Sequence, residues 1–328
     1  MVFAVTKHKM KQSASRNKKR ASLDLFFEQI FLFSVMMKEN GILRRGRWQI
    51  EDDFSYGCQR WHGLCNSQKL AELGMHVILY CRSAERGQAA QQRLKEETGN
   101  PSIDLVIGDL GSLASVRKSA AEINARFEKL DVLINNAGIV NLKKERTADG
   151  FEQMLGVNYV GHFELTRQLL PLMKRADAGR IVNVASGAYK FVKKKDQRFF
   201  DVANFLPWRE YGRSKKALIL FTDALAFQLR NTTVTANALH PGAVATSLGV
   251  SRQTGFGQSV YKMLTPFFKT PEEGSDTAIY LALSPEVAGI SGRYFVDRQA
   301  VPTEILDERQ QAQKLWEETQ RRIADQAQ

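Results

Sequence analysis

A tyrosine and a lysine four residues apart are the first side chains in this sequence whose types and spacing suggest chemistry. Tyr211 and Lys215 begin a segment, 211–229, whose pattern predicts a helix, so both side chains point to one face. A phenol ordinarily has a pKa near ~10, and an ammonium held nearby stabilises the phenolate and lowers that pKa. The pair therefore predicts a general acid and base that works near neutral pH. The alternative is an ordinary pair of side chains on a helix surface.

Further polar features stand where predicted strands end. Ser186 ends the apolar run "VNVAS", "NNAG" (135–138) ends the strand before it, and "HPG" (240–242) ends a later strand. Asn158 lies inside a predicted helix. Because asparagine is a mediocre helix former, a polar role explains its presence there better than helix formation does. Active groups of open α/β sheets gather at the carboxyl ends of strands, so packing alone explains this series of features poorly.

The elements that must position these residues alternate between strand and helix. The alternation predicts a doubly wound, Rossmann-like parallel sheet in a single domain, with helices on both faces and right-handed crossovers. The expected strands are 77–81, 103–110, 131–138, 180–186, 234–242 and 292–296, the last of which closes the sheet. The expected helices are 85–97, 113–127, 150–173, 211–229 and 271–283. We divide the chain into a basic, disordered extension (1–50), the Rossmann-type domain (51–300) and a C-terminal polar helix (301–328, helical from 304 to 327).

From about Lys69 to Val296 the chain resembles the short-chain dehydrogenase/reductase superfamily, and within it the retinol-dehydrogenase-like branch. The motifs that carry the resemblance are "GDL" (108–110), "NNAG", Asn158, Ser186, "YGRSK" (211–215) and "HPGAVAT" (240–246). The resemblance implies an oxidoreductase that transfers a hydride reversibly between a nicotinamide cofactor and an alcohol or carbonyl carbon.

The resemblance also implies catalytic roles. Tyr211 would be the acid and base, and Lys215 would lower its pKa and bind the nicotinamide ribose. Ser186 would orient the substrate carbonyl, and Asn158 would hold a water in a proton relay.

Cofactor contacts follow from the same motifs. Asp109 would contact the adenine, and Thr246 would contact the nicotinamide amide or the pyrophosphate. Other residues expected at the cofactor are Leu110, Asn136, Ala137, Gly138, Pro241 and Gly242. Arg82 ends the first regular strand, where an acidic residue would bind the ribose 2′-hydroxyl of NAD. A guanidinium suits the 2′-phosphate of NADP, so NADP is expected and NAD is the alternative. An ordinary surface arginine is the other explanation.

The sequence departs from the family in two places. Ser186 and Tyr211 are twenty-five residues apart, which is wider than usual, and the added loop either shapes the substrate site or is simply solvated. The second departure is the glycine-rich turn, threonine-glycine, three residues, glycine, one residue, glycine, which is missing from residues 51–68.

A shift of reading frame explains the missing turn. Codons allowed for residues 51–68, read one nucleotide later, permit KTIFLTGANGGMGFATAK, which restores a strand, the glycine pattern and the start of a helix. One glycine is nearly forced, because TGG of Trp61 followed by the C of His62 reads GGC. Our hypothesis is therefore that 51–68 is a frame-shifted segment and that everything before it is spurious translation.

Composition limits the remaining possibilities. The formal charge is +12, and cations crowd the first twenty residues: Lys7, Lys9, Lys11, Arg16, Lys18, Lys19 and Arg20. Such a tail suits nucleic acid or an anionic membrane surface, but no nucleic-acid reader motif supports the first, so we expect no nucleic acid. The apolar segment Leu25–Met37 is short for a membrane span, which leaves an interfacial anchor or a poorly packed segment. Three cysteines without regular spacing argue against a disulfide framework and a metal site, and favour an intracellular location, cytoplasmic or peripheral to a membrane.

Two functions remain open at this stage. The first is an NADP-preferring oxidoreductase acting on a lipophilic alcohol, aldehyde or ketone, with the apolar segment Leu248–Phe268 as a lid or as ordinary packing. The second is a non-catalytic binding protein that kept the fold and lost the cofactor loop.

Overall fold

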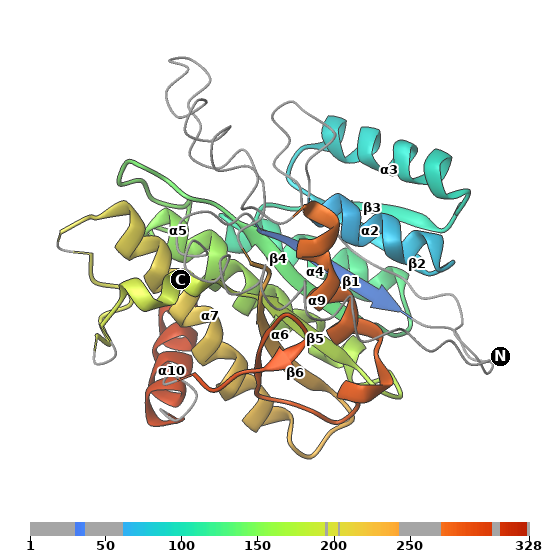
Figure 1. Cartoon of the computed structure of the whole chain (residues 1–328). Helices are drawn as coiled ribbons and strands as arrows, with labels where there is room; N and C mark the ends of the chain where they lie inside the picture. The colour runs from blue at the N-terminus through green and yellow to red at the C-terminus, as the bar shows by residue number, and fades with distance from the viewer. Residues whose placement is uncertain are drawn as a thin grey trace.

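The computed structural model describes residues 62–193, 196–202, 204–242, 270–303 and 309–326, and the backbone of 30–36. An eight-stranded sheet runs through it in the order β3-β2-β1-β4-β5-β6-β7-β8. The strands are β1 (Ile30–Met36), β2 (His76–Cys81), β3 (Ile103–Ile107), β4 (Val132–Gly138), β5 (Arg180–Val184), β6 (Thr235–His240), β7 (Tyr294–Val296) and β8 (Gln299–Ala300). Figure 1 shows helices packed over both faces of this sheet, which confirms the predicted doubly wound α/β fold.

Alternation along the strands builds one hydrophobic cluster on each face of the sheet. In β2, Val77, Leu79 and Cys81 belong to one cluster, and Ile78 and Tyr80 belong to the other. Side chains alternate between the faces of a strand, so an unbroken apolar run must be covered on both sides.

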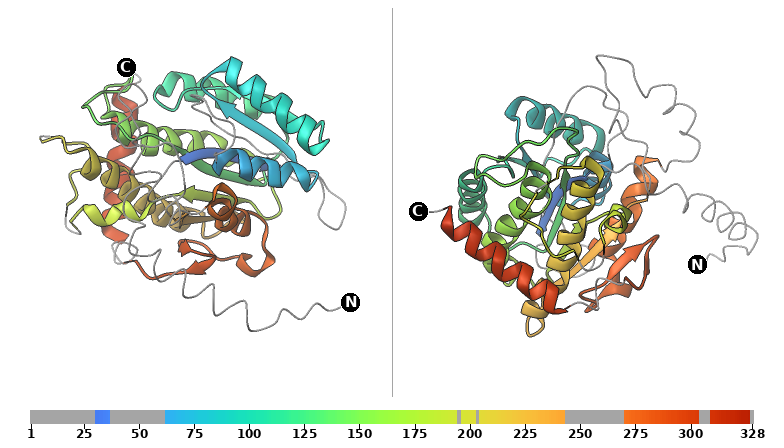
Figure 2. Two further views of the ribbon diagram at one scale, coloured as in Figure 1. Left: turned by 45° about the horizontal axis from the view of Figure 1, so that its top comes forward. Right: turned by 90° about the vertical axis from the view of Figure 1, so that its left-hand side faces the viewer.

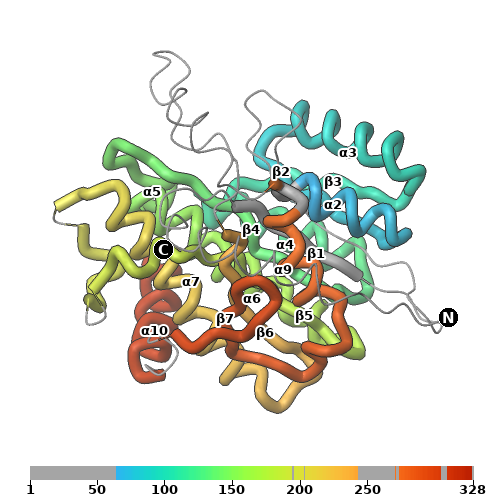
Figure 3. Tube along the Cα trace, in the orientation of Figure 1, coloured from blue at the N-terminus to red at the C-terminus, as the bar shows by residue number. Residues whose placement is uncertain are grey.

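Each face of the sheet is covered by three of the longer helices. The first cluster is covered by α2 (His62–Glu72), α3 (Ala84–Thr98) and α9 (Pro271–Leu283), and α2 lies beside α9 (Figure 3). The second is covered by α4 (Leu113–Arg126), α6 (His162–Met173) and α7 (Pro207–Leu229). Short helical segments are α5 (Gln153–Leu155), η1 (Gly156–Gly161), η2 (Gly187–Phe191) and η4 (Pro285–Val287).

The C-terminal helix α10 (Arg309–Asp325) docks onto the second face, alongside α7 (Figure 2). Trp316 stacks on Phe221 with ring centroids 5.9 Å apart and meets Phe163 edge-on at 4.8 Å. The hydroxyls of Thr319 and Tyr159 are 2.7 Å apart. These contacts fasten the predicted C-terminal polar helix to the domain.

Strand β1 differs from the sequence-based expectation. Residues 30–36 belong to the segment expected to be an anchor or poorly packed, within the extension expected to be disordered, yet their backbone forms a central strand. β1 runs antiparallel to both neighbours, with Val35 opposite Val132 of β4 and Met36 opposite His76 of β2. The other pairs from β2 to β7 are parallel. The sheet is therefore not wholly parallel.

Three element boundaries also differ from those expected. Helix α7 begins at Pro207 rather than residue 211, because proline is well suited to the first turn of a helix. The expected helix 150–173 contains the π-helical turn η1 around Asn158. The sheet does not close at β7, because β8 pairs antiparallel with it.

Candidate active site

The predicted pair, Tyr211 and Lys215, lies in the second and third turns of α7, and both side chains are buried. The Lys215 ammonium lies 5.7 Å from the centre of the Tyr211 ring. The Lys215 Nζ also donates to the carbonyl oxygen of Val184, the last residue of β5, at 3.2 Å. This bond holds the pair at the carboxyl edge of the sheet, two residues before Ser186.

Asn158 is fixed by both ends of its amide. Its Oδ1 accepts from the Ile139 N–H at 2.7 Å, and its Nδ2 donates to the Ile139 carbonyl at 3.0 Å, as a neighbouring strand would. The same Nδ2 donates to Ser214 Oγ at 3.0 Å, and Ser214 lies between Tyr211 and Lys215 on α7. Turns of π-helix are frequent at functional sites, and here η1 places the asparagine between β4 and α7.

His162, one helical turn after Asn158, is a residue that the sequence analysis missed. It is wholly buried, and its Nδ1 lies 3.1 Å from the Asn158 carbonyl oxygen. Its Nε2 has no hydrogen-bond partner within the described part of the chain. Burial, with the Lys215 ammonium as a smaller cause, lowers the pKa of His162 to about 3. A histidine four residues after the helical asparagine was the available signal.

Ser186 is buried two residues after β5 and caps the short helix η2, where its Oγ accepts from the Ala188 N–H at 2.9 Å. Ala188 in turn lies against α7: a Cβ at Gly212 would overlap the Ala188 carbonyl oxygen. Glycine is therefore required beside Tyr211, and the close approach brings the turn of Ser186 next to the pair.

A second polar group missed by sequence joins the two strands beneath the site. Asn135 Nδ2 donates to Asn183 Oδ1 at 2.7 Å and to Thr166 Oγ1 at 2.9 Å. Asn183 Nδ2 donates to Thr222 Oγ1 at 2.8 Å, so the ladder ties β4 and β5 to α6 and α7. Next to it, the wholly buried Asn136 has both side-chain polar atoms unpartnered within the described residues. Ala137 and Gly138 complete the end of β4.

The residues expected at the adenosine lie at the carboxyl ends of β2 and β3. Arg82 is exposed directly after β2. Asp109 Oδ1 accepts from the Gly111 N–H at 2.8 Å, which forms a turn after β3, and Leu110 beside it is buried. Gly108 is required because a Cβ there would overlap the Tyr80 hydroxyl. These residues share an edge with the Tyr211 pair.

The last strand-end motif is partly described. Pro241 and Gly242 follow β6, and Gly242 adopts a φ of +88°, which favours glycine. Thr246 and the segment Leu248–Phe268 lie outside the described residues.

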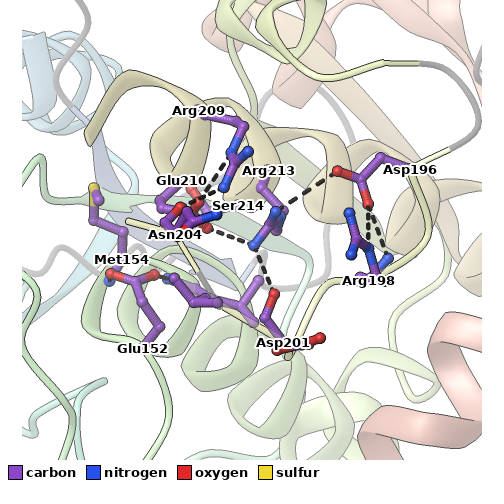
Figure 4. A network of polar contacts seen from close by, with 12 residues as sticks. Glu152, Met154, Asp196, Arg198, Asp201, Asn204, Arg209, Glu210, Arg213 and Ser214 are labelled. Atoms are coloured by element: carbon purple, nitrogen blue, oxygen red, sulfur yellow. Dashed lines mark hydrogen bonds and ion pairs between the residues drawn. The ribbon is translucent and has the colours of Figure 1, made fainter. Parts of the chain in front are cut away.

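The loop after η2 is fastened to α7 by cations, as Figure 4 shows for Arg209 and Arg213. Arg213 donates to Glu210 Oε2 at 2.6 Å and to the Asp201 carbonyl at 3.2 Å. Lys216 donates to the carbonyls of Lys193 and Asp196 at 3.3 and 3.2 Å. Burial raises the pKa of Glu210, and Arg213 opposes that shift. One side of α7 therefore anchors the added loop while another carries Tyr211 and Lys215.

A nicotinamide dinucleotide fits one half of this edge. Beside β4, β5 and α7 there are a buried lysine, a phenol and the unpartnered amide of Asn136, which suit the polar atoms of a nicotinamide ribose.

The pyrophosphate half does not fit. Its usual cradle is a short turn from a strand's carboxyl end to a helix N-terminus. Here β1 ends at Met36, which lies opposite His76, the first residue of β2. The C-terminal end of β1 and the C-terminal end of α2 therefore lie at the same edge of the sheet, so the N-terminus of α2 does not follow β1 across a short turn. Residues 37–61 separate β1 from α2, where such connections commonly have about 2–6 residues.

Comparison with known proteins now defines the family. A family model described as short chain dehydrogenase matches residues 56–255. The chain belongs to the short-chain dehydrogenases. Within them it stands in the retinol-dehydrogenase-like branch: human retinol dehydrogenase 14 is 41% identical over 275 residues, covering 78% of this chain and 81% of the relative. Human polyprenol dehydrogenase is 34% identical over 263 residues, covering 77% and 79%. This family consists of oxidoreductases that use nicotinamide cofactors.

Solved structures of the same fold agree. An uncharacterized protein from Mycobacterium paratuberculosis superposes with a TM-score of 0.62 at 26% identity, covering 79% of this chain and 88% of the other. The Pseudomonas aeruginosa RhlG/NADP active-site complex gives a TM-score of 0.57 at 26% identity, covering 72% and 90%. The short-chain dehydrogenase therefore shares the fold of its family over most of its length.

Proposed function

We propose that this short-chain dehydrogenase interconverts a lipophilic alcohol and its aldehyde or ketone with NADP(H). The observation that carries the proposal is that Tyr211, Lys215, Asn158 and the turn of Ser186 meet at one edge of the sheet. Lys215 contacts the Tyr211 ring and Val184, Asn158 bonds Ser214 of the same helix, and Gly212 lies against Ala188 in the turn of Ser186. Relatives named for retinol and polyprenol support a long apolar substrate.

The cofactor, when bound, supplies or accepts the hydride. Tyr211 donates a proton to the carbonyl oxygen during reduction and removes it from the hydroxyl during oxidation. The Lys215 ammonium near its ring favours the negative charge that forms on the phenol during reduction. The Ser186 hydroxyl orients the same substrate oxygen. Asn158, which is hydrogen-bonded to Ile139 and Ser214, holds the end of β4 and α7 in fixed positions relative to each other.

NADP is preferred to NAD in this proposal because Arg82 is exposed directly after β2. A guanidinium makes a charge-assisted, bidentate pair with a phosphate, and a ribose hydroxyl offers it no such partner.

We further propose that residues 51–68 are read in a shifted frame and that the chain as written lacks its pyrophosphate site. The direction of β1 and the long interval 37–61 support this. On α2, Asn66 is wholly buried with both side-chain polar atoms unpartnered within the described residues, which costs about 1–3 kcal/mol. The shifted frame places threonine there. Resequencing the gene tests this directly: an unbroken frame through the segment would overturn it.

The alternative function, a binding protein without catalysis, is favoured by the same pyrophosphate misfit. A screen of alcohols and carbonyl compounds, followed at the absorbance of NADPH, separates the two functions. It uses the chain as written and a frame-repaired chain, in which KTIFLTGANGGMGFATAK replaces residues 51–68. Turnover by the repaired chain supports the oxidoreductase, and a repaired chain that binds NADPH but turns over no substrate supports the binding protein.

A further inference from the structure

Large apolar side chains are exposed on the loops at the edge of the sheet that carries Tyr211. Leu142, after β4, is 67% exposed, and Phe191, at the end of η2, is 37% exposed. Leu206 and Trp208, on either side of the first residue of α7, are 55% and 39% exposed. We call these four residues the apolar rim.

The rim loops meet around the candidate active site. Ile139, Val140 and Phe205, which belong to the same loops, pack against the cluster that contains Tyr211 and Ala188. Lys144 Nζ donates to the Val202 carbonyl at 2.9 Å and so joins the loop after β4 to the loop before α7. Figure 1 shows both loops on the side of the molecule where α7 begins.

Lysines alternate with the rim residues. Lys143 and Lys144 follow Leu142 in the sequence. Lys190 directly precedes Phe191, and Lys193 follows it by two residues. All four lysines are exposed. Two acidic residues of these loops are engaged elsewhere: Glu145 accepts from Asn141, and Asp196 pairs with Arg198 and Arg213. Asp201 is exposed, so the lysines outnumber the carboxylates left facing solvent. Exposed apolar groups, a tryptophan and lysines together suit the interface of an anionic bilayer, where rings and methyl groups enter the boundary and ammonium groups meet lipid phosphates.

We propose that the apolar rim docks on an anionic lipid surface and that the substrate passes from the lipid into the site. The identity of the substrate rests on the proposed function, whereas docking on the lipid surface does not. A lipophilic alcohol partitions into the bilayer, so a site that opens against the membrane receives it without transfer through water.

Co-sedimentation with vesicles of phosphatidylcholine, alone and mixed with phosphatidylserine, tests the docking. We compare the full chain with Phe191→Ser/Trp208→Ser, and thermal unfolding checks that this variant is folded. The matched control is Leu73→Ser/Phe227→Ser, at exposed apolar positions away from the rim. We expect the rim variant to lose about tenfold or more in affinity for the mixed vesicles, since each ring gains free energy on entering the lipid boundary. The control should bind as the parent does.

Charge is tested by Lys143→Gln/Lys190→Gln, which should reduce the preference for phosphatidylserine vesicles. Unchanged binding by the rim variant would assign binding to the basic N-terminal segment and overturn the proposal. Equal loss in the control, or no vesicle binding by the parent, would also overturn it. Vesicle binding needs neither cofactor nor turnover. The vesicle experiment can therefore be interpreted even if the proposed function is wrong, and a failure to bind vesicles does not contradict the proposed function.

Discussion

At the scale of single residues, the site depends on side chains that are buried beside one another and have few alternative conformations. Lys215 is wholly buried and bonded to a strand carbonyl, and Asn158 is held by three hydrogen bonds to Ile139 and Ser214. Ordered in this way, the groups lose little entropy when substrate arrives, which is the basis of preorganised catalysis.

Tyr211→Phe should abolish turnover in the frame-repaired chain and leave NADPH binding near normal, because the phenol transfers a proton and adds little binding area. General acid and base groups contribute about 10²–10⁴ in rate. Steady-state kcat and calorimetric titration of NADPH measure the two effects. Tyr280→Phe, whose hydroxyl bonds Glu286 on the surface, is the control. A Tyr211→Phe enzyme with most of its kcat at neutral pH would remove Tyr211 from the mechanism.

Arg82→Ala should lower the preference of the repaired chain for NADP over NAD by roughly ten- to a hundredfold. The change removes a charge-assisted pair with phosphate, worth on the order of 1.5–3 kcal/mol, at ~1.4 kcal/mol per decade. The measurement is kcat/KM with both cofactors, and Arg86→Ala, one turn into α3, is the control. An unchanged ratio would make Arg82 a surface residue.

His162 should make the fold acid-sensitive. Its pKa is lowered to about 3 in the folded protein, against about 6.5 for an exposed histidine. Between these values the unfolded chain binds a proton that the folded chain does not, so stability is complete above about pH 6.5 and falls as the pH is lowered. Between pH 7.5 and pH 5 the contribution lost is about 2 kcal/mol at 1.36 kcal/mol per unit. Urea unfolding of the parent and of His162→Asn at both pH values measures it, and an equal acid loss in both would exclude His162 as the cause.

At the scale of elements, α7 performs two tasks. One side presents Tyr211 and Lys215, and Arg209, Arg213 and Lys216 hold the added loop by its carbonyls. The loop that sequence analysis left open between shaping the site and being solvated is thus fastened to the helix that carries the acid and base. A movement of that loop together with α7 would displace the turn of Ser186, because Ala188 in that turn lies against Gly212 of α7.

Arg213→Met should destabilise the protein by about 3–5 kcal/mol, because it leaves the buried Glu210 carboxylate without its closest cation. The double variant Glu210→Met/Arg213→Met should recover most of that loss, since the apolar pair avoids desolvating two charges. Urea unfolding at neutral pH gives both values. If the double variant were as unstable as the single, the contact with the Asp201 carbonyl, rather than the ion pair, would be the important bond.

At the scale of the whole molecule, the middle of the sheet is the discordant part. The family model matches residues 56–255, and no helix in the described part of the chain is long and apolar enough to cross a membrane. Between β2 and β4, however, stands a strand of reversed direction, followed by a long interval before α2.

The chain as written should therefore bind NADPH weakly or not at all, and the frame-repaired chain should bind it tightly and unfold at higher temperature. The glycine turn supplies backbone N–H groups at a helix N-terminus, and the new strand supplies a parallel neighbour for β2 and β4. Calorimetric titration and thermal unfolding of the two proteins measure both effects. A third protein, repaired and lacking residues 1–50, should match the repaired chain if that segment is dispensable. Equal, tight binding by the unrepaired chain would show that another surface holds the pyrophosphate.

Sequence alone determined the fold class, because strand and helix periodicities reflect which faces are buried, and that information is local. It also determined the candidates Tyr211, Lys215, Ser186 and Asn158, because their residue types and their positions, at a strand end for Ser186 and within helices for the others, can be read from the sequence. Only the tertiary structure showed that His162 lies beneath the asparagine, that Asn135 and Asn183 join two strands, and that Arg213 fastens the loop to α7. The contacts of Asn135 and of Arg213 join residues brought together by packing, and spacing along the chain carries no signal for them. The four-residue spacing of His162 from Asn158 can be read from the sequence, but the burial of the histidine ring cannot. Strand direction is likewise set by the neighbours, which is why an apolar segment interpreted as an anchor could stand as β1 at the centre of the sheet.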